Sequence, residues 1–276
     1  MNYRHSYHAG SHSDVFKHAA LCLLIESLQR KEKAMFMLDS HAGTGCYDLQ
    51  SAESQKTKEY AGGIGAVLSS DAPTLAPYLR LIRDMNPHGL EKYPGSPLLM
   101  ARFMRPQDRA AVCELHPDDF GRLKSLLAAE RSVAVHHRDG YEAMLAFIPP
   151  KERRGLIFVD PPFEKSDETK MLASRLAAAC AKWPTGTFAA WYPVKDIGAG
   201  RLLKDVLRER FAEKTLAATF LRYPVDGATL AGSGLIVVNV PWKFDQTLRQ
   251  LCSELAHAFG DAERCRWSVE WLAASR

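Results

Sequence analysis

Short apolar segments alternate with amphipathic segments along most of the 276-residue chain. The first apolar segment, MFML at residues 35–38, leads directly into Asp39 and a glycine-containing loop at residues 40–45. Further strand-like segments occupy residues 110–114, 132–137, 155–160, 186–192, 215–221 and 234–240. Helical patterns of about 10 to 15 residues separate most of them, which predicts parallel β-α-β units in a Rossmann-like α/β fold with helices on both faces of a mostly parallel sheet.

Two parts of the chain depart from this alternation. No helical pattern separates residues 215–221 from 234–240, so we expect these strands to form an antiparallel hairpin at one edge of the sheet. Residues 46–95 carry adjacent glycines and four prolines around short helical patterns. We therefore expect a main domain formed by residues 1–45 and 96–276, and an inserted small helical subdomain formed by residues 46–95.

The N-terminal region predicts a long helix. Apolar residues recur at helical spacing as far as Gln29. Ser13 and Asp14 are of the types that cap helix N-termini, so we expect the helix to begin there.

Composition describes a globular chain with only a mild positive charge. The sequence is 46% hydrophobic and 25% charged, with a formal net charge of +4, which permits a polyanionic partner without indicating one. The longest uncharged segment, residues 227–242, is shorter and more polar than the roughly 20 apolar residues of a membrane span. Because residues 1–18 also lack a signal-peptide pattern, we expect a cytoplasmic protein with no membrane partner.

Neither the cysteines nor the histidines predict a metal site. The six cysteines contain no C-x-x-C pair, so we interpret them as reduced thiols. His5, His8, His12 and His18 are close together in sequence, but their spacing lacks the cysteine or carboxylate partners of a metal centre. We interpret this N-terminal segment as an arm that folds over a functional site, the alternative being a solvated terminus.

Three strand ends carry groups suited to a nucleoside-containing cofactor, because ligands of open α/β sheets bind at the carboxyl ends of strands. The loop after Asp39 allows close backbone approach, but it lacks the third glycine of a dinucleotide signature and so disfavours a nicotinamide enzyme. Glu114 can accept hydrogen bonds from both hydroxyls of a ribose. Asp139, followed by Gly140, can accept one from an adenine amino group. Glu114 and Asp139 could alternatively be helix caps.

The fourth strand end, Asp160-Pro161-Pro162-Phe163, indicates the chemistry. Proline has no N–H, so a carboxylate and a backbone carbonyl can both accept from one amino group. Two such acceptors increase the electron density on a nucleobase amine and oppose the positive charge of methyl transfer. Phe163 offers a face on which an extruded base can stack. Asp-Pro-Pro is also an ordinary turn former, so the interpretation depends on the ordered set of four strand ends.

Nearly the whole chain resembles the bacterial large-subunit ribosomal RNA adenine methyltransferase J family, which has a class I S-adenosylmethionine-dependent fold. The resemblance is carried by YRHSYHAGSHSDVFKH at 3–18, LDSHAGTGCYDL at 38–49, YPGSPL at 93–98, ELHPDD at 114–119, DGYE at 139–142, RRGLIFVDPPFE at 153–164, WYPV at 191–194 and SGLIVVNVPW at 233–242. It implies transfer of a methyl group from S-adenosylmethionine, with no metal, to N6 of a specific adenine in 23S ribosomal RNA.

The resemblance also implies roles for individual residues. Asp160 is the implied catalytic acceptor, and Tyr3 is implied to lie near the target base, where the residue chemistry also places Pro161 and Phe163. The implied cofactor-binding residues are His18, His41, Ser96, Glu114, Asp139, Gly140 and Asp160, to which we add Lys17 and Gly43. Lys17 could hold the carboxylate of the donor by charge. Phe163 stands where tyrosine is equally usual in the family, which keeps a stacking face and removes a hydroxyl.

The site of RNA contact is not evident from charge. Residues 46–95 carry five Lys or Arg against six acidic residues, so they do not form a basic arm. Positive clusters lie at Arg102, Arg105 and Arg109, at Lys151, Arg153 and Arg154, and at Arg201, Lys204 and Arg208. These clusters either follow phosphates or form solvated helix faces.

The substrate that we expect is 23S ribosomal RNA, free of protein or partly assembled, with no obligate protein partner. Three alternatives remain open: a guanine-N2 ribosomal RNA methyltransferase, a DNA adenine-N6 methyltransferase, and a non-catalytic RNA-binding protein of the same fold. The intact Asp160 argues against the last.

Overall fold

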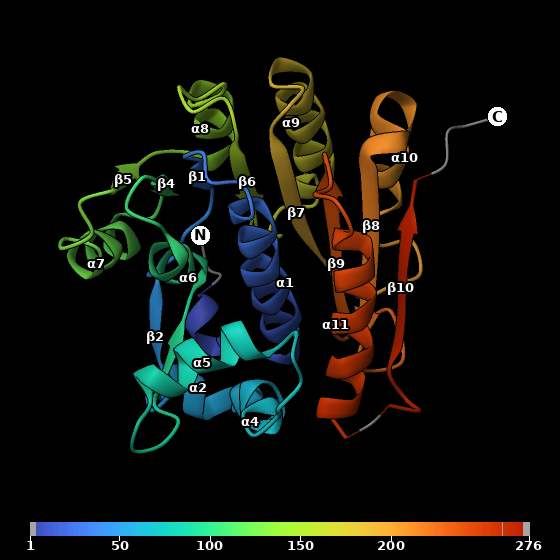
Figure 1. The fold of residues 1–276 in the computed structure, drawn as a ribbon. Coiled ribbons are helices and arrows are strands. Elements are labelled where there is room, and N and C mark those ends of the chain that lie inside the picture. Colours follow the sequence, from blue (N-terminus) through green and yellow to red (C-terminus); the bar gives the residue numbers. More distant parts are fainter. Residues whose placement is uncertain (1–3, 261, 273–276) are drawn as a thin grey trace.

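A single central sheet organises the structure, a computed structural model that describes residues 4–260 and 262–272 (Figure 1). Within these residues the sheet has eight strands in the order β10-β8-β9-β7-β6-β1-β4-β5. The strands are β1 (Phe36–Asp39), β4 (Arg109–Glu114), β5 (Val133–His137), β6 (Gly155–Val159), β7 (Thr187–Val194), β8 (Thr215–Leu221), β9 (Gly232–Val238) and β10 (Arg266–Trp271).

The five strands β5, β4, β1, β6 and β7 are parallel neighbours. Strand β9 is antiparallel to both β7 and β8, which confirms the predicted mostly parallel α/β fold with an antiparallel pair. One detail of the prediction was wrong: β10 pairs antiparallel with β8 and is the outermost strand, so the hairpin is not itself the edge. Polar and charged residues alternate with Trp267, Val269 and Trp271 in β10, and this segment was missed.

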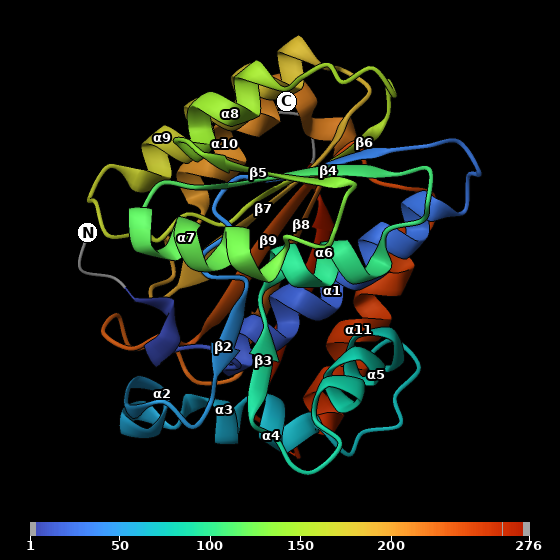
Figure 2. The ribbon, with the colours of Figure 1, turned by 90° about the vertical axis from the view of Figure 1, so that its left-hand side faces the viewer.

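Helices cover both faces of the sheet (Figure 2). On one face lie α8 (Gly140–Ala146), α9 (Glu168–Lys182) and α10 (Arg201–Phe211). On the other lie α1 (His12–Gln29), α6 (Ser96–Phe103) and α11 (Phe244–Ala258), with α7 (Pro117–Leu126) packed beside α6. Because both faces are covered, central strands such as β6 are buried at every position, which is why they are continuous apolar runs in the sequence.

Helix α1 begins earlier than predicted and ends at Gln29 as expected. The cap is Ser11, whose Oγ accepts a hydrogen bond from the backbone N–H of Asp14 at 3.4 Å. The prediction that Ser13 and Asp14 cap the helix was therefore wrong. Asp14 instead accepts from the backbone N–H of Gly10 at 2.9 Å and is buried in the first turn of α1. Its side chain lines the cavity described below.

Residues 46–95 form β2 (Cys46–Asp48), α2 (Ala52–Thr57), α3 (Glu59–Gly62), α4 (Ile64–Val67), α5 (Ala76–Met85) and β3 (Lys92–Pro94). Strands β2 and β3 pair antiparallel with each other, outside the central sheet. The buried Ile64, Tyr78 and Tyr93 of this segment belong to the same hydrophobic cluster as Phe16 of α1. The segment thus packs directly on the first helix. Two short 3₁₀ helices complete the described elements, at His5–Tyr7 and Ala212–Lys214.

Candidate active site

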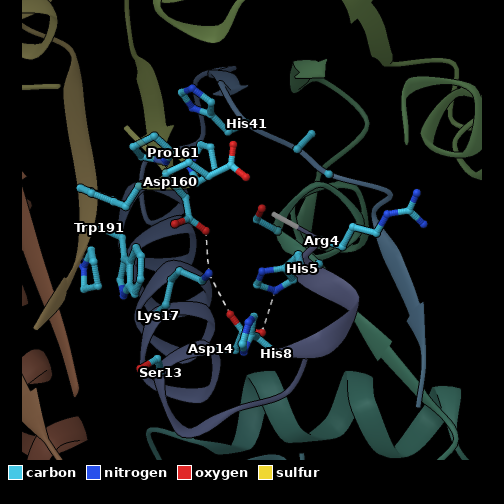
Figure 3. A pocket seen from close by; sticks show the side chains of 18 of the residues that line it. Arg4, His5, His8, Ser13, Asp14, Lys17, His41, Asp160, Pro161 and Trp191 are labelled. Carbon is cyan, nitrogen blue, oxygen red and sulfur yellow. Dashed lines mark hydrogen bonds and ion pairs between the residues drawn. The ribbon is translucent and has the colours of Figure 1, made fainter. Parts of the chain in front are cut away.

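A cavity of about 1390 Å³ opens at the carboxyl ends of the parallel strands (Figure 3). Its lining includes every sequence-predicted site residue that the structure describes: Lys17, His18, His41, Gly43, Ser96, Glu114, Asp139, Gly140, Asp160, Pro161 and Phe163. Tyr3 lies outside the described residues. Sheet topology explains the convergence, because the loops after β1, β4, β5 and β6 all leave the sheet at the same edge.

Glu114 lies at one end of the cavity with its carboxylate held by backbone groups. Oε2 accepts from the N–H of Gly43 at 2.8 Å, and Oε1 accepts from the N–H of His116 at 2.7 Å. Burial raises the pKa of this carboxyl group. Glu114 is not the cap of α7, which is His116. Each oxygen has a second lone pair and so retains acceptor capacity.

Asp139 is the N-cap of α8, where Oδ1 accepts from the N–H of Glu142 at 3.0 Å. The helix-cap alternative is thus correct for Asp139, and its side chain also lines the cavity. Gly140 packs closely against the glycine loop, since a Cβ there would lie 2.0 Å from the carbonyl oxygen of Ser40. Only glycine allows this contact between α8 and the loop.

Two side chains near the end of β1 have strongly shifted pKa values: Asp39, the buried last residue of the strand, and His41, in the loop that follows. Burial lowers the pKa of His41 to about 4, so this imidazole is neutral at neutral pH. It packs edge-on against Tyr141 at 5.0 Å between ring centroids. Burial raises the pKa of Asp39 to about 7, and its Oδ2 has no hydrogen-bond partner among the described residues. Asp39 is therefore a polar group that is easily protonated, and it lies at the end of β1, where the loop begins.

Asp160 follows β6, which is separated from β4 and Glu114 by β1, and it belongs to a chain of charged side chains (Figure 3). Lys17 donates from Nζ to Oδ2 of Asp160 at 2.6 Å and contacts Oδ1 of Asp14 at 2.8 Å. Oδ2 of Asp14 lies 2.9 Å from Nε2 of His5. Burial opposes the charge on Lys17, but the two carboxylates outweigh it and raise the pKa of the ammonium. Burial also opposes ionisation of Asp14, yet His5 and Lys17 hold its pKa well below its usual value.

Sequence reasoning missed this arrangement. It assigned Lys17 to the carboxylate of the donor, whereas in the structure the ammonium is engaged by Asp14 and Asp160. Asp14 and Lys17 are three residues apart on α1, a spacing that could have indicated an ion pair between them. Nothing local to the sequence connects Lys17 to Asp160, which is 143 positions away.

An aromatic wall stands beside Asp160. The rings of Phe163 and Trp191 meet edge-to-face with centroids 5.8 Å apart, and Nζ of Lys17 lies 4.9 Å from the Trp191 ring. Trp191 donates from Nε1 to Oγ of Ser233 at 2.9 Å, which fixes the indole. Phe163 has a left-handed backbone with φ of 49°, a conformation that is uncommon for residues with side chains. Trp191 is a further lining residue that the strand-end reasoning did not single out.

His18 connects the cavity to residues 46–95. Its Nδ1 lies 2.7 Å from the hydroxyl of Tyr93, which in turn contacts the hydroxyl of Tyr78 at 2.9 Å. Burial lowers the pKa of His18 to about 3, so the imidazole is neutral. The neutral ring can exchange a hydrogen bond with a phenol, and this explains how a histidine is accommodated in the core.

The N-terminal arm runs along the cavity from the first described residue, because Arg4, His5, Ser6 and His8 all line it. His8 contacts Oε1 of Glu59 at 2.8 Å, and this hydrogen bond raises its pKa. The arm is therefore anchored to both α1 and α3 rather than solvated. Among residues 4–260 and 262–272, no three His, Cys, Asp or Glu side chains are grouped as metal ligands. Over the same residues, no helix combines the length and the apolar character that crossing a bilayer requires.

Most of the predicted basic clusters have structural partners. Arg105 and Arg154 donate to backbone carbonyls between residues 28 and 33, which fastens the end of α1. Arg109 pairs with Glu152. The third cluster pairs with acidic side chains too, through Arg208 to Asp205 and Lys204 to Glu270. These contacts favour ordinary ion pairs over a continuous phosphate track.

Comparison with known proteins gives consistent matches over most of the chain. The family model described as "Ribosomal RNA large subunit methyltransferase D, RlmJ" matches residues 32–273. The chain is 37% identical to ribosomal RNA large subunit methyltransferase J of Haemophilus influenzae and 35% identical to that of Escherichia coli K12, covering 99% of each chain in both cases. A crystal structure of a Legionella pneumophila protein is 32% identical, with a TM-score of 0.88 over 96% of this chain and 98% of that one.

Proposed function

Because the chain belongs to the large-subunit ribosomal RNA methyltransferase J (RlmJ) family, we propose that it methylates N6 of one adenine in 23S ribosomal RNA, with S-adenosylmethionine as donor. The observation that carries this proposal is the arrangement of Asp160 in the cavity. Its carboxylate lies near Phe163 and Trp191 and shares the cavity with Glu114, which ends a strand two places away in the sheet. One cavity thus offers a donor end and a base end.

The residues at the donor end fit a nucleoside. We assign the ribose hydroxyls to Glu114 and the adenine of the donor to Asp139, with His41, Gly43, Ser96 and Gly140 around them. The backbone-held oxygens of Glu114 and the closely packed Gly140 support this assignment. When bound, the donor supplies an electrophilic methyl group on a sulfonium. No metal ligand is assigned.

The base end is suited to a neutral amino group that becomes cationic during transfer. Oδ2 of Asp160 already accepts a hydrogen bond from Lys17, so we assign the target amine to Oδ1 and to the backbone carbonyl of Pro161. The charges of Asp14, Lys17 and Asp160 sum to −1. A fixed negative group at this position stabilises the positive charge that develops on nitrogen.

The aromatic wall is assigned to the target base itself. Phe163, supported edge-to-face by the buried Trp191, can stack on an extruded adenine while Pro161 and Asp160 accept from its amino group. Lys17, buried between Asp14 and Asp160, contacts both carboxylates and so fixes the direction of the Asp160 side chain. After transfer, Asp160 is placed to take the proton that the methylated amine must lose.

The experiment that tests the target is methylation of RNA from a strain that lacks this protein. Labelled donor is supplied, the RNA is digested to nucleosides, and label is expected in N6-methyladenosine alone. Label in N2-methylguanosine, or in DNA rather than RNA, would favour one of the two enzymatic alternatives. No label in either nucleic acid would favour the non-catalytic alternative.

The state of the RNA is a separate prediction. A base in a regular A-form stem cannot reach Asp160 without unpairing, so an irregular or single-stranded element is required. We expect protein-free or partly assembled RNA to be methylated faster than finished large subunits. Parallel time courses on a 23S transcript and on subunits from the deficient strain measure this, and equal rates would contradict it.

Donor affinity is expected to depend on Glu114. Glu114→Ala removes the acceptor of two hydroxyls and leaves the N–H groups of Gly43 and His116 unpaired. The loss is expected to be about 1–3 kcal/mol, or about 5- to 150-fold in Kd for S-adenosylhomocysteine by calorimetry. Glu209→Ala, on the exposed face of α10, is the control and should bind normally. Unchanged affinity in Glu114→Ala would remove this residue from the donor site.

A further inference from the structure

The cavity extends past the aromatic wall to a region with no role so far. This region is formed by the loop between β8 and β9, residues 222–231, and by the start of α3. Because β9 is antiparallel to β7, this loop lies at the same edge of the sheet as Asp160. A typical small-molecule pocket has about 300–1,000 Å³, so the 1390 Å³ cavity has room for more than one small ligand.

Tyr223 presents an aromatic ring in this region. The residue is 44% exposed and lines the cavity. Its backbone is held because the N–H groups of Arg222 and Tyr223 both donate to the carbonyl of Ala231, at 3.0 and 3.1 Å. His12 contacts the ring edge-to-face, with centroids 5.1 Å apart and planes at 80°. The guanidinium carbon of Arg222 also lies 5.6 Å from the ring centroid, and the exposed part of the ring is the area that remains for stacking.

Different residues of α1 support the Tyr223 ring and the position assigned to the target base. His12 supports Tyr223, whereas Lys17, five residues later, contacts Asp160. Five residues of helix rise about 7.5 Å. Stacked nucleotides are about 3.4 Å apart along one strand, and a flipped base leaves this stack, so its neighbour can bind at a separate position in the cavity. The ring is therefore placed for a neighbour of the flipped adenine.

Two lysines lie at the same end of the cavity. Lys58, between α2 and α3, and Lys195, after β7, are exposed and line it. Neither forms an ion pair with any residue in the described part of the chain. The carbonyl of Lys195 accepts from Gly227, which ties it to the Tyr223 loop at 2.9 Å. Acidic residues lie near both lysines: Glu59 is engaged by His8, and Asp226, on the Tyr223 loop, accepts a hydrogen bond from Thr229.

We propose that Tyr223 stacks a base of the nucleotide adjacent to the target adenine, with Lys58 and Lys195 contacting its phosphates. This inference rests on the proposed function, which it deepens by adding a second nucleotide subsite. Aromatic stacking accepts any base, so the subsite contributes affinity and positioning rather than base identity. Its loss affects RNA engagement and leaves the donor end unchanged.

The test is a coupling measurement on RNA that spans the mapped target. Tyr223→Ala is expected to raise KM for this RNA about tenfold, with kcat and the Kd for S-adenosylhomocysteine unchanged, and Tyr223→Phe should restore KM. For the wild-type enzyme, an abasic site in the RNA on one side of the target, either 5′ or 3′, should raise KM by the same factor. On that RNA, Tyr223→Ala should have no further effect.

Controls separate this inference from the proposed function. Trp242→Ala removes a 75% exposed aromatic residue after β9, at the opposite edge of the sheet, and should leave KM unchanged. Two results would refute the subsite and leave the proposed function standing, provided that wild type methylates the RNA. In the first, Tyr223→Ala has a normal KM. In the second, Tyr223→Ala raises KM by the same factor on both abasic RNAs as on intact RNA. If wild type does not methylate the RNA, the proposed function fails. A fall in kcat alone would place Tyr223 at the target base and also overturn the subsite.

Discussion

Asp160→Ala is expected to fold, to bind S-adenosylhomocysteine and to lose methyl transfer by about 10²–10³-fold. Removing one preorganised group that stabilises transition-state charge has an effect of that order. In this site the loss is also electrostatic, because Asp14 and Lys17 alone sum to zero charge and no longer oppose the cation on nitrogen. Single-turnover methylation of RNA at saturating donor measures the chemical step directly.

The matched control for this variant is Asp167→Ala. Asp167 lies in the loop that follows the Asp160 motif, is exposed, and makes no capping hydrogen bond to α9. Its replacement should leave the rate within about twofold of wild type. If Asp160→Ala turned over at the wild-type rate, the assignment of Asp160 as the acceptor would be wrong. A variant with normal circular dichroism and normal donor affinity excludes misfolding as the cause of a loss.

Lys17→Met should destabilise the folded protein by about 3–5 kcal/mol, because it leaves the buried carboxylate of Asp14 and the partly buried carboxylate of Asp160 without their common partner. Nζ of Lys17 lies 2.8 and 2.6 Å from these carboxylates, and the lysine and Asp14 side chains are each only 3% exposed. Methionine has about the volume of the lysine stem, so the loss of stability reports the missing charge rather than the creation of a cavity. Urea unfolding followed by circular dichroism provides the free energy of unfolding.

Two further variants check the origin of the effect. Lys204→Met breaks a more exposed pair with Glu270, and surface pairs contribute about 0–1 kcal/mol, so its cost should be small. Asp14→Asn combined with Lys17→Met should recover part of the lost stability, because it removes one uncompensated charge. A cost for Lys17→Met no larger than that for Lys204→Met would show that the buried pairs do not stabilise the fold.

The same pairs determine the pH dependence of stability. The pKa of Asp14 in the folded state is held well below 3.8, its usual value, chiefly by His5 and Lys17 against the opposing effect of burial. A carboxyl group with a depressed folded pKa contributes stability above its unfolded pKa and loses it as the pH falls. The difference in the free energy of unfolding between wild type and Lys17→Met should therefore be largest near pH 7 and should decrease below about pH 4. A difference that is constant from pH 7 to pH 3 would contradict this.

Local patterns in the sequence were sufficient to predict the central strands and the polar residues at their ends. Strands such as β6 are buried on both faces, so each appears as an uninterrupted apolar run, and the polar residue that ends the run must lie at the ligand-binding edge. Glu114, Asp139 and Asp160 were found in this way, and all three line the cavity. The order of these residue types along the chain was also what indicated a nucleoside-binding enzyme.

Contacts between distant elements were beyond the reach of these patterns. The sequence placed Lys17 and His18 on a helix, but how α1 packs against β6 and β7 decides that Lys17 meets Asp160 and Trp191. In the same way, only the antiparallel return of β9 brings the loop that carries Tyr223 to the edge of the sheet where Asp160 lies. Periodicity describes which face of one element is buried, whereas a charge pair or a shared cavity depends on the register between elements, and packing alone determines that register.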